Sequence, residues 1–347
     1  MPYNRPMTGI VYALLSAALF GVSAPLAKLL LGAISPWLLA GLLYLGSGVG
    51  LALVRLVRRS NEAGLSRGDW PWFGAAVLSG GVVGPVLLVF GLAQSTAAEA
   101  SLLLNLESVL TLGIAWIVFK ENVDRRLLIG AGAIVAGAVV LSWPKDLALG
   151  SGTGPLLIAG ACLAWAIDNN LTRKVSAADP MQIAMLKGLV AGAVNVALAF
   201  MLGASLPAAV AIGEAGLLGF FSYGISLTLF VLALRHLGTA RTGAYYTLAP
   251  FIGAGVAILA LGEPITLPFL TGGALMAIGL WLHLSERHQH QHAHEPLEHE
   301  HAHVHDAHHQ HDHAPGTPPE PHAHKHRHGR MVHRHPHYPD LHHRHSH

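Results

Sequence analysis

Apolar residues in this chain gather in long runs that are separated only by short polar stretches. Each run has about 20 residues, which is the length that an α-helix needs to cross the hydrocarbon core of a bilayer. Strands of a membrane barrel would instead alternate between apolar and polar residues. The pattern predicts an all-α, polytopic membrane protein with ten transmembrane helices, at about 8–31, 36–57, 70–91, 96–119, 127–143, 153–172, 180–202, 213–234, 239–261 and 266–284.

The composition agrees with this interpretation. Charged residues make up 12% of the chain, about half the usual share for a globular protein. The mean hydropathy is positive, at +0.47, although the last 60 residues are almost entirely polar. We therefore expect a multi-pass protein of the cytoplasmic membrane.

Lysine and arginine residues at the helix ends set the expected orientation, because they favour the cytoplasmic side. With the N-terminus inside, thirteen of them fall in inside segments and two fall outside. The thirteen are Arg5, Arg55, Arg58, Arg59, Arg67, Lys120, Arg125, Arg126, Arg173, Lys174, Arg235, Arg241 and Arg287, and the two are Lys28 and Lys145. Both chain termini are therefore expected in the cytoplasm, as an even number of helices requires.

The two halves of the chain resemble each other. At a constant offset of 142 residues, Glu121 aligns with Glu263, Gly130 with Gly272, and Gly137 with Gly279. Each half would hold five helices, and an odd number makes the second copy enter the membrane upside down. We expect inverted repeats at 1–145 and 146–287, followed by a third region at 288–347.

The segment "LGEPITLPFLTGGALMAIG", from Leu261 to Gly279, and a glutamate closing the fourth helix of each half resemble the EamA branch of the drug/metabolite transporter superfamily. The resemblance covers roughly residues 8–284, and the first half departs from it by carrying Glu121-Asn122 in place of a glutamate-proline step. It implies an exporter of small metabolites. It also implies a central cavity lined by helices one to four and six to nine, with helices five and ten at the periphery.

The fourth helix is the richest in polar residues that could serve transport. Ser101, Asn105 and Ser108 have the i, i+4, i+7 spacing of one helical face. Glu107 lies about mid-membrane and Glu99 near the outer end. We expect the two serines to join helices by hydrogen bonds, and Glu107 to bind a proton or another cation, because a carboxylate at this depth is costly.

Further candidates lie on other helices. Asp168 and Asn169 are near the inner end of helix six, where a solvated helix end is an equally good interpretation. Lys187 could pair with Asp168 or contact an anionic substrate. The remaining candidates for the transport path are Lys28, which could instead pair with Glu99, and Asn195 and Tyr245, for which packing within the bundle is the alternative. Prolines inside helices one, three and nine are expected to kink them: Pro25, Pro85 and Pro250.

Of the 25 histidines, 23 lie between His288 and His347, among prolines and charged residues. A segment with so little to bury is expected to be disordered. Neutral imidazole binds zinc, nickel and cobalt well, and binding should weaken as the pH falls through about 6.5. The expected metal ligands are His288, His290, His292, His294, His299, His301, His303, His305, His308, His309, His311 and His313.

Signatures of enzymes are absent from the body of the chain: the sequence contains no P-loop, and no HExxH motif occurs before the histidine-rich tail. We expect a secondary transporter that needs no cofactor and exports a small metabolite, with a tail that binds zinc, nickel or cobalt. The alternatives are an exporter of these metal ions and a metal-sensing membrane protein without transport. The expected partners are the lipid bilayer, a small-molecule substrate, transition-metal ions and, through small residues such as Gly132 and Gly273, a second copy of the chain; nucleic acid is not expected.

Overall fold

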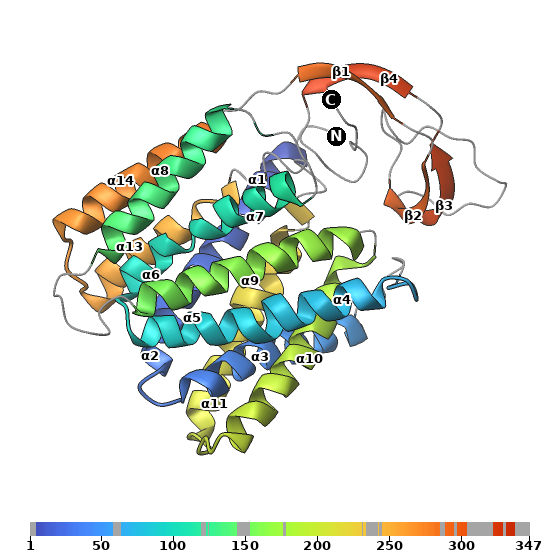
Figure 1. Ribbon diagram of the computed structural model, residues 1–347. Helices are drawn as coiled ribbons and strands as arrows, with labels where there is room; N and C mark the ends of the chain where they lie inside the picture. The colour runs from blue at the N-terminus through green and yellow to red at the C-terminus, as the bar shows by residue number, and fades with distance from the viewer. Residues whose placement is uncertain are drawn as a thin grey trace.

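The computed structural model describes residues 5–57, 64–118, 123, 125–143, 153–175, 178–230, 232–233, 242, 245–284, 289–294, 297–303, 322–328 and 331–336. A bundle of helices is followed by two pairs of short strands (Figure 1). Within these ranges, seven helices are long and apolar enough to cross a membrane: Thr8–Leu30, Pro36–Val57, Trp70–Ala93, Ala97–Ile117, Arg125–Ser142, Pro180–Met201 and Ala209–Phe230. The chain is therefore a polytopic membrane protein.

Three further helices occupy the positions of the other expected spans, namely α9 (Thr153–Val175), α13 (Ala249–Leu261) and α14 (Leu267–Leu284). Two of them are apolar but short, and α9 carries Asp168 and Lys174. Part of the span expected at 239–261 lies outside the described residues. The total of ten membrane spans stays a prediction.

Several spans are interrupted helices. The first span consists of α1 (Arg5–Gly21) and α2 (Ser23–Leu30), and the third of α4 (Trp70–Ala76), the π-helix η1 (Val77–Val83) and α5 (Gly84–Ala93). The fourth consists of α6 (Ala97–Leu103) and α7 (Leu106–Ile117), and α11 (Ala209–Gly219) continues into the π-helix η2 (Phe220–Ile225). The uninterrupted helices are α3 (Pro36–Val57), α8 (Arg125–Ser142) and α10 (Pro180–Met201). Pro25, Pro85 and Pro250 each lie within the first three residues of a segment that follows an interruption. This confirms the expected irregularities, because proline removes a helical hydrogen bond and clashes with the preceding turn.

Contacts between α3 and α10 come in exchanged pairs. Both helices have 22 residues and begin at a proline, 144 positions apart. A Cβ atom on Gly48 would lie 2.3 Å from the backbone nitrogen of Leu189, and one on Gly192 would lie 2.4 Å from that of Leu45. Gly192 corresponds to Gly48 and Leu189 to Leu45 at the offset of 144 residues, so each helix makes the same contact on the other. Because the contact position on α10 rises as that on α3 falls, the two helices run antiparallel.

Contacts between α8 and α14 repeat this arrangement. A Cβ atom on Gly130 would lie 2.8 Å from the carbonyl oxygen of Gly279, and one on Gly137 would lie 2.6 Å from that of Gly272. These are the glycines that the repeat aligns at an offset of 142. Gly132, which its spacing marks as a contact residue, has nothing within 4 Å of a Cβ at its position, so the close packing runs along a different face of α8.

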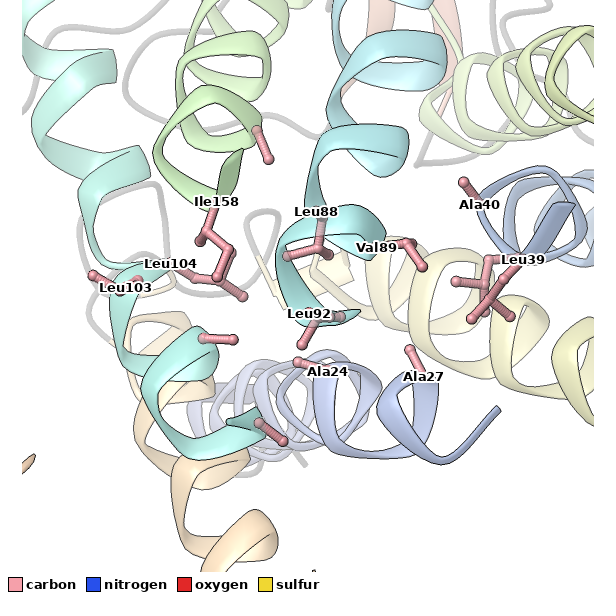
Figure 2. Close-up of a cluster of buried hydrophobic side chains, with 14 of the residues drawn as sticks. Ala24, Ala27, Leu39, Ala40, Leu88, Val89, Leu92, Leu103, Leu104 and Ile158 are labelled. Atoms are coloured by element: carbon pink, nitrogen blue, oxygen red, sulfur yellow. The ribbon is translucent and has the colours of Figure 1, made fainter. Parts of the chain in front are cut away.

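The apolar core is densest at one end of the bundle. Figure 2 shows alanine and leucine side chains from α2, α3, α5, α6 and α9 converging there, with Leu39, Val89, Leu92 and Ile158 fully buried. Asp168 lies ten residues farther along α9 than Ile158, about 15 Å at 1.5 Å per residue. Polar side chains therefore collect beyond this packed end.

The described parts of the tail are extended. Strand β1 (Gln289–His294) pairs antiparallel with β4 (Met331–Pro336), and β2 (Leu297–His303) pairs antiparallel with β3 (His322–His328). For these four segments the structure differs from the predicted disorder, and the all-α prediction applies to the bundle alone. Histidine at every second position is compatible with the two-residue repeat of a strand. The other tail residues lie outside the described ranges.

Candidate functional site

The interruption of the fourth span brings its polar residues together. Residues 104–105 form a turn between α6 and α7. The Asn105 side-chain amide donates to the carbonyl oxygen of Leu102 at 2.9 Å, and the Ser108 hydroxyl donates to that of Asn105 at 2.8 Å. Ser101 donates to Ala97 at 2.7 Å. Both serines bond to their own span, which corrects the expectation that they bond across to another helix. Asn105 stabilises the break and also lies 3.9 Å from the Met276 sulfur of α14.

Glu107 follows this break as the second residue of α7. Its carboxylate accepts a hydrogen bond of 2.8 Å from the Asn169 amide of α9, and Asn169 is also 3.4 Å from the Thr111 hydroxyl. Glu107 is partly buried. It interacts electrostatically with Tyr44 on α3 and with Tyr246 before α13. Because these partners belong to separate helices, the carboxylate points toward the interior of the bundle.

Asp168 and Lys187 form a buried ion pair. The ammonium nitrogen of Lys187 lies 2.7 and 2.8 Å from the two carboxylate oxygens of Asp168, and the Thr172 hydroxyl donates to one of these oxygens at 2.8 Å. Both side chains are largely buried. Of the two interpretations of Lys187, the structure shows the pairing with Asp168. A Cβ atom on Gly80 would lie 1.9 Å from this carboxylate, so glycine is required there.

The π-helix η1 offers carbonyl groups to side chains from three other helices. The Tyr44 hydroxyl of α3 and the indole N–H of Trp165 of α9 both donate to the carbonyl oxygen of Gly80 at 2.9 Å. Asn195 of α10 is fully buried and donates to the carbonyls of Gly81 and Val82, each at 3.3 Å. The predicted site residue Asn195 therefore bonds to the backbone of η1. Tyr44 and Trp165 were not predicted from the sequence. The Gly80-Gly81 pair inside an apolar run was the available signal.

Lys28 and Glu263 bind helix ends at the packed end of the bundle. The Lys28 ammonium group donates to the carbonyl oxygens of Leu92 and, at 2.7 Å, of Ser95, where α5 ends. Glu263 accepts the backbone N–H groups of Ala97 and Ala98 at 2.7 Å each, where α6 begins. Each charge matches the dipole of the helix end that it contacts. Lys28 therefore lies away from Glu107, whereas Glu99 is partly buried in the first turn of α6.

Aromatic rings form a continuous row through the bundle. The ring centroids of Tyr44 and Tyr223 lie 5.5 Å apart, those of Tyr223 and Phe20 5.8 Å, those of Phe20 and Tyr246 5.6 Å, and those of Tyr246 and Phe230 4.8 Å. All except Tyr44 are only partly buried. The predicted tyrosine was Tyr245, which is partly buried, but its neighbour Tyr246 is the one in this row.

No group of three histidine, cysteine, aspartate or glutamate side chains that could hold a metal occurs where the structure describes side chains. Cys162 is buried. Half of the predicted metal ligands, His290, His292, His294, His299, His301 and His303, lie in the strands β1 and β2. The other half, His288, His305, His308, His309, His311 and His313, lie outside the described residues.

Comparison with known proteins supports a transporter. A curated "Uncharacterized transporter" from Methanothermobacter thermautotrophicus (strain ATCC 29096 / DSM 1053 / JCM 10044 / NBRC 100330 / Delta H) is 27% identical over 304 residues, which cover 81% of this chain and 87% of that protein. A solved protein crystal structure with 19% identity has a TM-score of 0.58 and covers 80% of this chain and 96% of its own, which supports the fold alone. The profile of the EamA-like transporter family matches twice, at residues 7–143 and 152–285. The chain belongs to the EamA-like transporter family.

Proposed function

We propose that this protein is a secondary transporter of the cytoplasmic membrane that exports a small metabolite, with Glu107 as the group that binds a proton or another cation during transport. The family supports transport across a membrane. Glu107 faces the interior of the bundle beside a helix break. Interrupted helices and π-helical segments often mark functional sites in membrane proteins.

The observation that carries this proposal is the contrast between Glu107 and three other acidic residues within the described part of the bundle. Asp168 pairs with Lys187, Asp179 lies 2.8 Å from Arg55, and the carboxylate of Glu263 accepts two backbone N–H groups. Glu107 receives a single amide hydrogen bond. A poorly compensated charge is costly away from water, so this carboxyl group is suited to take up a cation.

The groups around Glu107 do not supply that cation. Those that interact with it electrostatically are Asp168, Cys162, Tyr44 and Tyr246. None of them is cationic. On α8, which also packs against α7, Arg125 and Arg126 occupy the first two positions of the helix, at its end. Within the described part of the chain no cationic side chain bonds this carboxylate, which supports a proton or a cationic ligand as its partner.

The exchanged glycine contacts support inverted repeats. A two-fold axis reverses the direction of a helix only if the axis is perpendicular to that helix. The axis that relates these antiparallel helices is therefore perpendicular to them. For helices that cross a membrane, this axis lies in the membrane plane, as in transporters with inverted repeats. The proposal therefore includes five spans in each half and, from the excess of inside lysine and arginine, both termini in the cytoplasm.

Export can be tested by metabolite profiling of cells that express the protein. Cells with the native chain should release at least one small metabolite faster than cells without it. Glu107→Gln should abolish this difference, because the amide cannot take up a proton or balance a cation. Glu214→Gln is the matched control, since Glu214 lies exposed on α11, and it should behave like the native chain. Unchanged release by Glu107→Gln would contradict the role of this carboxylate.

A second function, metal binding by the tail, is favoured by the strand register. His290 lies opposite His335 and His292 opposite His333, and the second ladder sets His299 opposite His326. Directly opposite residues of an antiparallel ladder are close neighbours on one face. We propose that the tail binds zinc, nickel or cobalt in the cytoplasm, which leaves a metal-ion exporter and a metal sensor as the rival functions.

Truncation after Arg287 tests the tail separately. The shortened protein should still fold and insert, because the glycine and core contacts described above belong to the bundle. Nickel binding by the purified protein, measured by calorimetry, should fall sharply, and in the full chain it should weaken below about pH 6.5 as imidazole gains a proton. Equal nickel binding by both chains would refute a metal-binding tail.

A further inference from the structure

We infer that the substrate of this transporter is an organic cation, an amine with an aromatic or similarly flat group, whose charge binds at Glu107 and whose ring binds along the row Tyr44, Tyr223, Phe20, Tyr246 and Phe230. The inference rests on the proposed transport function and adds the chemical class of the substrate. It is carried by the charges in the bundle, by the position of the aromatic row and by the small number of oxygen ligands around Glu107.

The cationic side chains inside the bundle already have partners. Lys187 contacts both carboxylate oxygens of Asp168, Lys28 contacts two carbonyl oxygens, and Arg55 contacts Asp179. The other cationic side chains that the structure describes lie before α4, at the start of α8 and at the end of α9: Arg67, Arg125, Arg126 and Lys174. Among the described residues, no cationic side chain bonds Glu107, so an anionic substrate would lack a partner there, whereas a cationic substrate would find a carboxylate without a cation.

The aromatic row and this carboxylate are connected through α9, where Asn169 bonds Glu107 and Trp165, four residues earlier, shares the carbonyl oxygen of Gly80 with Tyr44. Glu107 interacts electrostatically with Tyr44 and Tyr246, which are the first and fourth rings of the row. The face of an aromatic ring carries a negative potential and attracts cations within about 6 Å of its centroid. Rings that follow one another at 4.8–5.8 Å also offer stacking surface for a flat ligand. One ligand could therefore place its charge at the carboxylate and its ring on the row.

A bare metal ion fits this position poorly. Magnesium and calcium require about six or more oxygen ligands, and zinc requires about four nitrogen, sulfur or oxygen ligands. The polar neighbours given by the hydrogen bonds here are the amide of Asn169 and the hydroxyl of Thr111. An ammonium group needs only a carboxylate and one or two further acceptors.

Binding of three probes of similar size and different charge tests the inference on the full-length protein in detergent. Benzylamine is a cation, benzyl alcohol is neutral and benzoate is an anion at neutral pH. We expect calorimetry to show that benzylamine binds at least about tenfold more tightly than benzyl alcohol, and that benzoate binds most weakly. Glu107→Gln should remove the preference for the amine, and Glu214→Gln should retain it.

The aromatic contribution is tested with Tyr246→Leu and Tyr246→Phe. The leucine variant should weaken benzylamine binding several-fold because it removes the ring, and the phenylalanine variant should retain most of it. Equal affinity of the native protein for benzylamine and benzyl alcohol, or an amine preference that survives Glu107→Gln, would overturn the inference. If either of these binding results is accompanied by Glu107-dependent export of a neutral or anionic metabolite, the proposed transport function is supported and the proposed substrate class is wrong. If the native protein prefers the amine but cells that express it export no metabolite, the proposed binding site is supported and the proposed transport function is wrong.

Discussion

Two acidic residues on neighbouring helices differ in the partners that their carboxylates contact. Asp168 is neutralised by Lys187 and bonded by Thr172, so it joins α9 to α10. Among the described residues, the hydrogen-bond donor to the Glu107 carboxylate is the amide of Asn169, and we propose that its charge is available to a cation. From the sequence both were candidates for the transport path, because hydropathy shows that a charge is inside a span but not which other charge lies beside it.

Removing Lys187 should therefore destabilise the fold rather than only alter substrate binding. Lys187→Met leaves the Asp168 carboxylate buried without its partner, which typically costs about 3–5 kcal/mol. The double variant Asp168→Asn/Lys187→Met should recover most of that loss, as measured by thermal unfolding in detergent. A single variant as stable as the native protein would show that the ion pair is not structural.

At the scale of the elements, glycine contacts determine how closely the helices approach. The self-similarity of the sequence aligned Gly130 with Gly272 and Gly137 with Gly279, and across α8 and α14 the contacts are exchanged, Gly130 with Gly279 and Gly137 with Gly272. Local small-residue spacing also marked Gly132, whose Cβ position is open within the chain. Spacing along one helix cannot identify the partner helix, and the alignment of the two halves does not show which helices pack together, so this contact could not be predicted from the sequence.

Substitution of these glycines separates contact positions from open ones. Gly137→Val should destabilise the bundle by about 1–3 kcal/mol, since its Cβ atom would lie 2.6 Å from the carbonyl oxygen of Gly272. Gly132→Val, on the same helix, is the control and should change the melting temperature little. Comparable losses for the two variants in detergent would contradict the described packing of α8 against α14.

At the scale of the whole molecule, the sequence predicted a polytopic helical bundle and its two EamA-like halves, and both are confirmed. Less could be predicted about the interior. Tyr44 and Trp165 meet at the carbonyl of Gly80 although they come from different helices, and no pattern along a single helix shows such a meeting. The strands of the tail were missed because composition favoured disorder, while pairing joins residues that are 19–31 positions apart in one ladder and 37–47 in the other.

The most direct test of the account is transport by purified protein in proteoliposomes, with a metabolite identified by profiling and an imposed pH gradient. The account predicts that the native protein and Glu214→Gln accumulate the metabolite in proportion to the gradient, and that Glu107→Gln does not respond to it. Accumulation by Glu107→Gln with the same dependence on the gradient as the native protein would contradict the central role of this carboxylate.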